Sequence, residues 1–320
     1  MKKKPFKAII LAGGSGERFW PISTPEKPKQ FLTLFGGRSL IAQTFDRLRG
    51  IVDPAGSFVI TSKALVALTR RELPDLPRSH ILGEPVRRDT GAAVALGVNS
   101  AAEDDSEVLG FFPSDHLVAD VPAFRKVVKS AIALARKEDS IVVIGIRPTA
   151  PSTAFGYIDP KRGKFVEKPC LAKARRYLKR GYLWNAGMFI ARASVFKSAF
   201  ARVAPALAAV RLADYPGLPR ISFDYAVMEK IGNIRVLPGD FGWDDVGGYP
   251  ALEKHFPVDA SGNVLLGDAR QLHSRNVSVV SRGLPVTVLG ASDLVVVSTP
   301  TQLFVVGKSA LGRMKELTEG

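Results

Sequence analysis

The sequence predicts an α/β fold, in which helices cover both faces of a mostly parallel sheet and a small β-rich domain follows. Over the first two thirds of the chain, short apolar runs alternate with amphipathic helical patterns. This alternation is typical of parallel sheets covered by helices. From residue 262 to residue 306 the helical periodicity is lost, and short β-rich runs are separated by Gly, Asp and Asn.

The elements of the first part follow in chain order. Buried strands are expected at residues 7–11, 57–61, 108–112 and 141–146. Ser39 suits an N-cap for one helix, and Asp120 with Pro122 marks the start of another. Residues 222–230 have the apolar spacing of a helix core.

The second part begins near Pro257. Its β-rich runs are expected at residues 264–266, 277–280, 286–289, 294–297 and 303–306, before a short helical segment at 310–317. We therefore predict two domains, one of residues 1–256 and one of residues 257–320.

Composition limits the class of protein. The 320 residues are 46% hydrophobic, which is typical of a globular chain. Cys170 is the single cysteine, which excludes an internal disulfide and suits a reducing compartment. The apolar run after the first lysines is too short for a signal peptide, and no stretch approaches the roughly 18 apolar residues of a membrane span. We expect a soluble, cytoplasmic protein that does not bind membranes.

The formal net charge is +15. Nucleic-acid binding is one explanation of such a charge. The longest basic run is only Lys2-Lys3-Lys4, however, and aromatic residues do not interleave with the cations. The sequence therefore favours small anionic substrates over nucleic acid.

A glycine-rich turn follows the first strand directly. Gly13, Gly14 and Gly16 allow the backbone to turn tightly and to point amide groups at phosphate oxygens, and Arg18 adds a guanidinium. The turn is not a P-loop, because no Gly-Lys-[Ser/Thr] follows, and Phe19 replaces the third glycine of the dinucleotide fingerprint. On the glycines alone, a phosphate loop and a simple turn are equal alternatives.

Further motifs follow in order along the chain. They are WPIS at 20–23, PKQFL at 28–32, EPVRRDT at 84–90, PSDH at 113–116, GYI at 156–158, FVEKP at 165–169, WNAGMF at 184–189 and GWDDVG at 242–247. Together with LAGGSGER at 11–18 they resemble the signature of the mannose-1-phosphate guanylyltransferases, within the sugar-1-phosphate nucleotidyltransferase family. The resemblance covers residues 7 to 252. The β-rich tail resembles the short left-handed β-helix of bacterial members.

The resemblance implies a Rossmann-like nucleotidyltransferase fold and a specific reaction. GMP would pass from GTP to α-D-mannose 1-phosphate by direct in-line attack assisted by Mg²⁺, giving GDP-mannose and pyrophosphate. Because the sequence ends at Gly320, we expect the short, single-activity type without the phosphomannose isomerase domain of longer relatives.

The resemblance also implies site residues. The nucleotide would bind at Leu11, Ala12, Gly13, Gly14, Ser15, Gly16, Glu84, Pro85, Arg88 and Asp115. The catalytic residues would be Arg18, Lys29, Asp115 and Asp245, of which Asp115 and Asp245 hold the metal. The sugar phosphate would bind at Gly156, Tyr157, Glu167, Lys168 and Asn185.

The chemistry of some of these residues supports their assigned roles, and three positions differ from the family pattern or are variable in it. A carboxylate at Glu84 suits guanine, whose N1–H and exocyclic amine are both donors. His116 is expected to be a structural hydrogen-bonding residue. Asp89 stands where asparagine is common, Ala186 replaces a usual hydroxyl residue, and Asp244 occupies a variable position.

Two alternatives stay open. One is the same chemistry with another sugar or base, such as glucose 1-phosphate with dTTP or UTP. The other is a non-catalytic sensor of GDP-mannose or GTP, which the presence of all the expected cations and carboxylates disfavours. The sequence does not fix the number of subunits, and a homodimer is left open.

Overall fold

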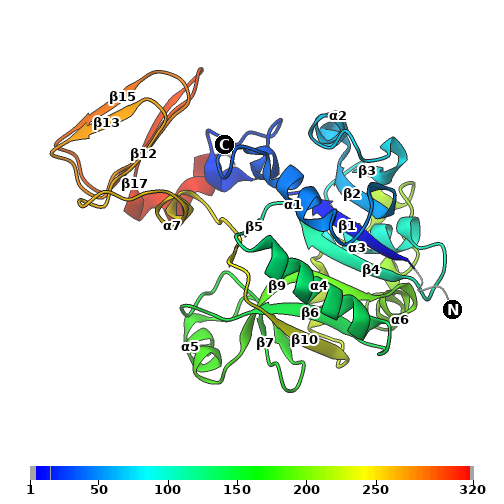
Figure 1. Cartoon of the computed structure of the whole chain (residues 1–320). Helices are drawn as coiled ribbons and strands as arrows, with labels where there is room; N and C mark the ends of the chain where they lie inside the picture. The colour runs from blue at the N-terminus through cyan, green and yellow to red at the C-terminus, as the bar shows by residue number, and fades with distance from the viewer. Residues whose placement is uncertain (1–4, 15, 318–320) are drawn as a thin grey trace. The chain divides into compact units, whose positions relative to one another are not determined.

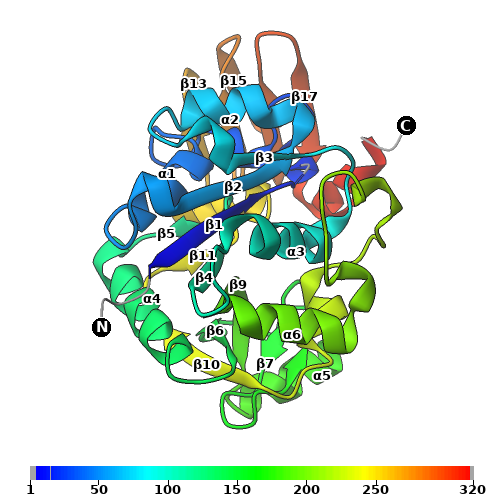
Figure 2. The same ribbon diagram turned by 90° about the vertical axis from the view of Figure 1, so that its right-hand side faces the viewer.

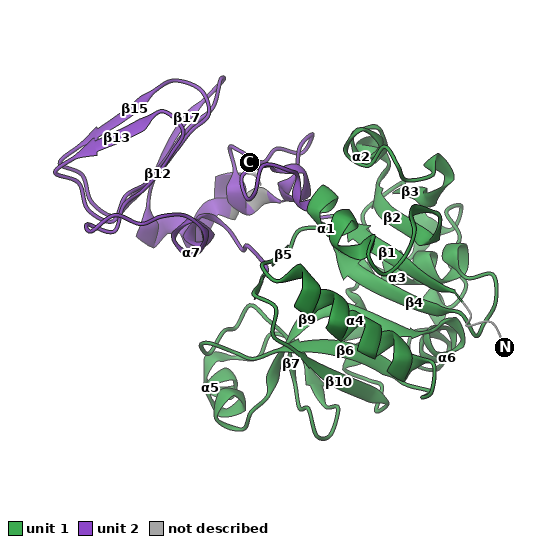
Figure 3. Cartoon of the chain, viewed as in Figure 1, with its two compact units in different colours: residues 1–13, 41–244 green, residues 14–40, 245–320 purple. Residues whose placement is uncertain are grey.

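The computed structural model describes residues 5–14 and 16–317, without the side chains of residues 17 and 315. Ser15 of the predicted nucleotide loop lies outside the described residues. The chain forms two compact units, residues 1–13 with 41–244 and residues 14–40 with 245–320 (Figure 3). The predicted division between residues 256 and 257, which rests on the change to short β-rich runs near Pro257, stays a prediction.

The first unit is built on a mostly parallel sheet. Its main path has the order β10-β6-β9-β4-β1-β2-β3, in which β9 is antiparallel to both neighbours and the other pairs are parallel. The strands are β1 (Phe6–Ala12), β2 (Ser57–Ser62), β3 (Ile81–Glu84), β4 (Val108–Pro113), β6 (Ile141–Ile146), β9 (Leu183–Arg192) and β10 (Ile234–Gly239). The four strands predicted for this unit are confirmed.

Smaller pairings extend this sheet. A hairpin of β7 (Tyr157–Ile158) and β8 (Phe165–Val166) pairs through β7 with β9. A separate two-stranded ribbon joins β5 (Leu117–Val118) to β11 (Trp243–Asp244).

Helices cover both faces of the sheet, as the sequence predicts (Figure 2). Neighbouring side chains of a strand point to opposite faces. In β4, the Phe111 ring contacts Phe196 of α6 (Ala193–Val203), whereas the Phe112 ring contacts Phe124 of α4 (Val121–Ala135). The helices of the chain are α1 (Leu40–Leu48), α2 (Val66–Glu72), α3 (Asp89–Ala101), α4 (Val121–Ala135), α5 (Leu171–Lys179), α6 (Ala193–Val203) and α7 (Leu252–His255).

Local signals explain where some helices begin. Asp120 caps α4, because its Oδ1 accepts from the Ala123 amide at 2.8 Å, and Pro122 lies in the first turn. The predicted start of this helix is confirmed. Residues 224–228 form a π-helix, η8 (Asp224–Met228), whose Ala226, Val227 and Met228 are buried.

The second unit contains a coil of short parallel strands (Figure 1). Strands β12 (Val264–Leu266), β14 (Ser278–Ser281) and β16 (Leu294–Ser298) pair in parallel, as do β13 (Ala269–Leu272) and β15 (Val286–Leu289). β17 (Leu303–Gly307) adds an antiparallel edge, and the predicted final helical segment is the 3₁₀ helix η10 (Lys308–Leu317). A core of valines fills the coil: Val277, Val279, Val286, Val288 and Val296. The region resembles a short left-handed β-helix, as predicted.

The remaining elements of the second unit lie in its N-terminal segment and around residue 250. They are the 3₁₀ turns η1 (Glu17–Phe19), η2 (Lys29–Phe31) and η9 (Tyr249–Ala251), followed by α7. The Tyr249 hydroxyl donates to the carbonyls of Phe19 and Trp20, which ties these two segments together. Among residues 5–14 and 16–317, no helix is long and apolar enough to cross a membrane.

Candidate active site

The predicted site residues divide between the two units. The first unit holds Leu11, Ala12, Gly13, Glu84, Pro85, Arg88, Asp115, Gly156, Tyr157, Glu167, Lys168 and Asn185. The second holds Gly14, Gly16, Arg18, Lys29 and Asp245. The chain crosses between the units inside the glycine turn and again inside the GWDDVG motif.

One corner of the first unit is formed where two parallel strands end. β1 ends at Ala12 and β3 ends at Glu84, so both reach the carboxyl edge of the sheet, where such folds bind ligands. The Glu84 side chain is buried, and a methyl group placed on Gly13 would lie 3.0 Å from Glu84 Oε2. The other oxygen, Oε1, accepts a hydrogen bond from the Tyr215 hydroxyl. The structure therefore brings Gly13 and Glu84 together.

The segment after Glu84 is fastened to residues 216–223. Arg88 donates through Nη2 to the Pro216 carbonyl, and Thr90 Oγ1 accepts from the Phe223 amide at 2.9 Å. Asp89 has a positive φ of 55° and accepts from Arg220 at 3.4 Å. Pro85 is exposed beside Glu84.

Burial raises the pKa of Glu84 to about 7. The hydrogen bond from Tyr215 and the charge of Arg87 oppose this rise, and the charge of Asp89 adds to it. A buried carboxyl that ionises near neutrality is a common feature of functional sites.

Glu84 is expected to make stability depend on pH. The carboxyl titrates at 4.5 when unperturbed and at about 7 in the fold, so the folded protein holds the proton more tightly between these values. Its contribution to stability is full below pH 4.5 and is lost as the pH rises through 7. In wild type this titration should lower the free energy of unfolding as the pH rises, and we expect Glu84→Gln to make that decrease smaller by about 1–3 kcal/mol.

Urea unfolding of wild type and Glu84→Gln at about pH 5 and about pH 7.5 measures the effect. Asp224 shifts in the same direction, so the variant should keep part of the slope. Equal pH slopes in the two proteins would show that Glu84 does not titrate in this range.

Asp115 lies just beyond β4, at the same edge of the sheet. Its side chain is 33% exposed, and Oδ1 lies 3.7 Å from His116 Nε2. His116 Nδ1 accepts from Trp243 Nε1 at 3.1 Å, which fits the structural role predicted for this histidine. Carboxylate, histidine and ribbon β5–β11 form one connected cluster.

Arg47 of α1 packs behind this cluster. It is buried, donates to the His116 carbonyl at 3.0 Å and to Thr44 Oγ1 at 2.7 Å. Burial lowers the pKa of Arg47 to about 10, and the negative charge of Asp115 opposes that change. The sequence did not predict that Arg47 would be buried beside Asp115 and His116, because a single arginine in an amphipathic helix usually faces solvent.

The residues predicted to bind the sugar phosphate gather in a third cluster. A methyl group on Gly156 would lie 2.5 Å from Glu167 Oε2, so this oxygen lies close to the glycine, and Glu167 Oε1 pairs with Lys168 Nζ at 3.0 Å. The backbone amide of Asn185 donates to the Gly156 carbonyl at 2.9 Å. Tyr157 is buried, and its hydroxyl accepts from the Ser152 amide at 2.9 Å.

Asp224 belongs to this cluster and was not predicted. Its Oδ1 accepts from Asn185 Nδ2 at 2.9 Å, while Asn185 Oδ1 accepts from the Gly187 amide at 2.9 Å. Asn185 is therefore oriented by the protein on both sides of its amide group. Its segment, SFDYAVMEK at residues 222–230, also resembles a motif of the family, but its apolar spacing favoured a helix-core role for most of it.

The Lys168 ammonium pairs with Glu167, and its charge also acts on Asp224. Burial raises the pKa of Asp224 to about 7, with the charge of Glu167 adding to the rise and Lys168 and Asn185 opposing it. Burial lowers the pKa of Lys168, but Glu167, Asp224 and Tyr225 outweigh it, so the pKa is raised. Lys168 therefore stays a cation suited to phosphate.

The second unit groups the remaining predicted residues around two glycines. Gly16 has a φ of 68°, and any side chain on it would collide with the Lys29 backbone. Lys29 is buried, and its Nζ donates to the Asp245 carbonyl. A methyl group on Gly247 would lie 3.4 Å from Asp245 Oδ2 and 3.5 Å from Arg18 Nη1. Arg18, Lys29 and Asp245 therefore meet within this unit.

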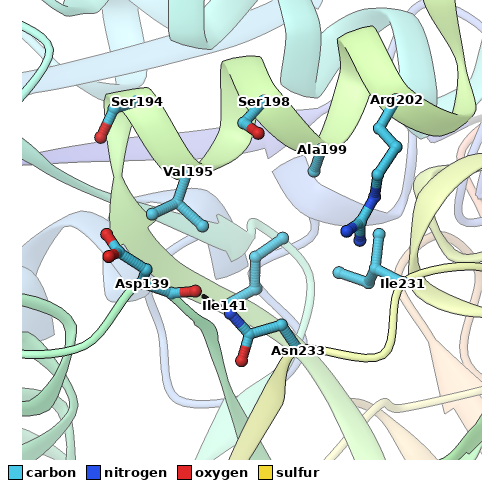
Figure 4. A pocket seen from close by; sticks show the side chains of 9 residues that line it. All are labelled: Asp139, Ile141, Ser194, Val195, Ser198, Ala199, Arg202, Ile231 and Asn233. Carbon is cyan, nitrogen blue, oxygen red and sulfur yellow. Dashed lines mark hydrogen bonds between the residues drawn. The ribbon is translucent and has the colours of Figure 1, made fainter.

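Two further features of the structure concern metal-binding groups and a pocket away from these clusters. Within the described residues, no group of three or more His, Cys, Asp or Glu side chains could hold a metal ion, and a pair of aspartates is not such a group. A pocket of about 280 Å³ lies between α6, β6 and residues 231–233, where Ser198 and Arg202 line one side (Figure 4). It contains none of the predicted site residues.

Comparison with known proteins gives the family. The family model described as nucleotidyl transferase matches residues 7–261. A mannose-1-phosphate guanylyltransferase of Klebsiella pneumoniae is 36% identical over 346 residues, covering 97% of this chain and 73% of that protein. The xanthan biosynthesis protein XanB of Xanthomonas campestris pv. campestris (strain B100) is 36% identical over 336 residues, covering 97% and 72%.

A solved structure agrees with these relatives. The Thermus thermophilus protein named mannose-1-phosphate geranyltransferase matches with a TM-score of 0.90 and 36% identity, covering 98% of each chain. The chain belongs to the nucleotidyl transferase family.

Proposed function

We propose that this enzyme transfers GMP from GTP to α-D-mannose 1-phosphate, giving GDP-mannose and pyrophosphate. The observation that supports this best is the set of three clusters: a buried acceptor at Glu84, a carboxylate–ammonium group around Lys168, and the cations Arg18 and Lys29 beside Asp245. Similar proteins that carry the guanylyltransferase name favour mannose and guanine over the alternatives.

The reaction requires charge neutralisation more than proton transfer. An oxygen of mannose 1-phosphate attacks the α-phosphorus of GTP in line, and pyrophosphate leaves. The attacking phosphate is already ionised at neutral pH, so no general base is needed. In this proposal Arg18 and Lys29 neutralise the triphosphate, the amides of the glycine turn bind its oxygens, and Lys168 binds the sugar phosphate.

Nucleotidyl transferases generally use a divalent metal ion. Asp115 and Asp245 fit Mg²⁺, because both offer hard carboxylate oxygens and Asp115 is partly open to solvent. Bound there, Mg²⁺ would supply positive charge to the reacting phosphates.

Sugar recognition is assigned to Glu167, Asn185 and Asp224. Carboxylates accept from sugar hydroxyls, and Asn185 is already oriented by Asp224 and Gly187. Ala186 offers no hydroxyl of its own, which makes glucose 1-phosphate a necessary comparison.

The lysines and arginines were expected to be spread along the chain, but many of them are concentrated around Lys168. Nine lysines and arginines lie between residues 161 and 180 against one glutamate, Glu167. All nine are exposed; they lie in the β7–β8 turn, in the loop before α5, and on α5 or directly after it. Such a surface attracts anionic substrates such as GTP and mannose 1-phosphate.

The proposal is tested by pyrophosphate release with purified protein and Mg²⁺. We expect turnover with GTP and mannose 1-phosphate, and much slower turnover with dTTP, UTP or ATP, or with glucose 1-phosphate. Faster turnover with another pair would reassign the substrate, and binding without turnover would indicate a sensor. We also propose that the enzyme acts in the cytoplasm and binds neither nucleic acid nor membranes. A homodimer stays a prediction.

A further inference from the structure

Tyr215 belongs to none of the motifs that define the proposed site, yet it contacts one of its residues. It opens the 3₁₀ turn η7 (Tyr215–Gly217) and is completely buried. Its hydroxyl donates to Glu84 Oε1, across 131 positions of sequence. A buried tyrosine hydroxyl generally has a hydrogen-bond partner. Here the partner is Glu84, the carboxylate that is proposed to bind guanine.

The surroundings hold this pair from several sides. Glu84 Oε2 faces Gly13, so the two oxygens are constrained by different segments. The next residue after Tyr215, Pro216, accepts from Arg88. The Gly91 amide donates to the Ile221 carbonyl at 3.0 Å, and a methyl group on Gly91 would lie only 2.6 Å from that oxygen. Residues 215–223 are therefore fastened along residues 84–91.

We propose that Tyr215 is a positioning residue for base selection, whose hydroxyl orients the Glu84 carboxylate and keeps it an acceptor for the two donors of guanine. The inference rests on the proposed function, in which Glu84 meets the base. The tyrosine uses one lone pair of Oε1, which leaves acceptor sites on both oxygens for guanine N1–H and the exocyclic amine.

The protonation state gives this positioning a measurable consequence. Burial raises the pKa of Glu84 to about 7, Tyr215 and Arg87 oppose the rise, and Asp89 adds to it. Burial and the charge of Glu84 raise the pKa of Tyr215 itself, with Arg88 opposing, so the hydroxyl remains a donor. Loss of that hydroxyl would leave Glu84 protonated at higher pH, and a protonated carboxyl would present a donor to the donors of guanine.

The test compares Tyr215→Phe with wild type by equilibrium binding of GTP and ITP, because inosine lacks the exocyclic amine. We expect Tyr215→Phe to weaken GTP binding about tenfold, roughly the effect of losing one hydrogen bond to a charged group. ITP should be affected less, so the preference for GTP falls. As the pH is lowered, GTP binding should begin to weaken at a higher pH in the variant than in wild type.

Two controls separate positioning from general structure. Tyr182→Phe removes another tyrosine hydroxyl bonded to a carboxylate, that of Asp159, and should leave the GTP preference unchanged. In a Glu84→Gln background, Tyr215→Phe should cause little further loss, because the two residues act as one unit.

An unchanged ratio of GTP to ITP affinity in Tyr215→Phe would overturn the inference, as would full additivity with Glu84→Gln. These measurements need no turnover. Failure of wild type to make GDP-mannose would contradict the proposed function instead, so the two failures are distinguishable.

Discussion

Lys29→Ala is expected to lower turnover about 10²–10³-fold, the size of losing one charge contact made in the transition state. Lys29 is buried in the 3₁₀ turn η2, and its Nζ lies against the Asp245 carbonyl rather than in solvent. Its backbone lies so close to Gly16 of the glycine turn that a side chain there would collide with it. In our account its ammonium neutralises the triphosphate as pyrophosphate leaves, so the turnover number should fall more than the affinity for mannose 1-phosphate.

Lys27→Ala provides the matched control, because this lysine is two residues away and exposed. Its loss should leave turnover within about twofold of wild type, as is usual for a surface residue without a site contact. A near-normal rate for Lys29→Ala, with the glycine turn still folded, would remove Lys29 from the reaction.

Replacing Asp245 or Asp115 by asparagine is expected to raise the Mg²⁺ concentration for half-maximal rate by at least about tenfold. An asparagine keeps the shape but loses the charge of the ligand, and even outer groups of metal sites alter affinity by about 10–100-fold. Rates measured over a Mg²⁺ titration at saturating GTP give the value directly.

Asp240→Asn serves as the control for this titration, because Asp240 is exposed and lies five residues before Asp245. It should leave the Mg²⁺ requirement unchanged. If Asp115→Asn and Asp245→Asn titrate like wild type, the two aspartates do not bind the metal and the assignment is wrong.

Local sequence patterns predicted much of the sheet but not all of it. The four expected strands are buried apolar runs, and the α4 start carries both an aspartate cap and a proline. β9 was not predicted, although it is ten residues long and central. Its place between β4 and β6, antiparallel to both, depends on pairing with distant strands, which no local pattern reports.

The same limit applies to the site. Glycines and carboxylates that follow strands are visible in the sequence, because strand ends place them at one edge of the sheet. Arg47, Tyr215 and Asp224 were missed because their meaning comes from partners far along the chain: His116, Glu84 and Asn185. A buried arginine, tyrosine or aspartate becomes informative only once its partner is known.

The central claim is that Asp115 and Asp245 hold the metal ion of a GMP transfer in which Glu84 binds guanine and Glu167 binds the sugar. A crystal structure with GDP-mannose and Mn²⁺, using the anomalous signal of the metal, tests it most directly. We expect a metal peak bound by carboxylate oxygens of both Asp115 and Asp245, with the guanine edge at Glu84 and the mannose at Glu167. A metal bound elsewhere, or a guanine remote from Glu84, would contradict the account.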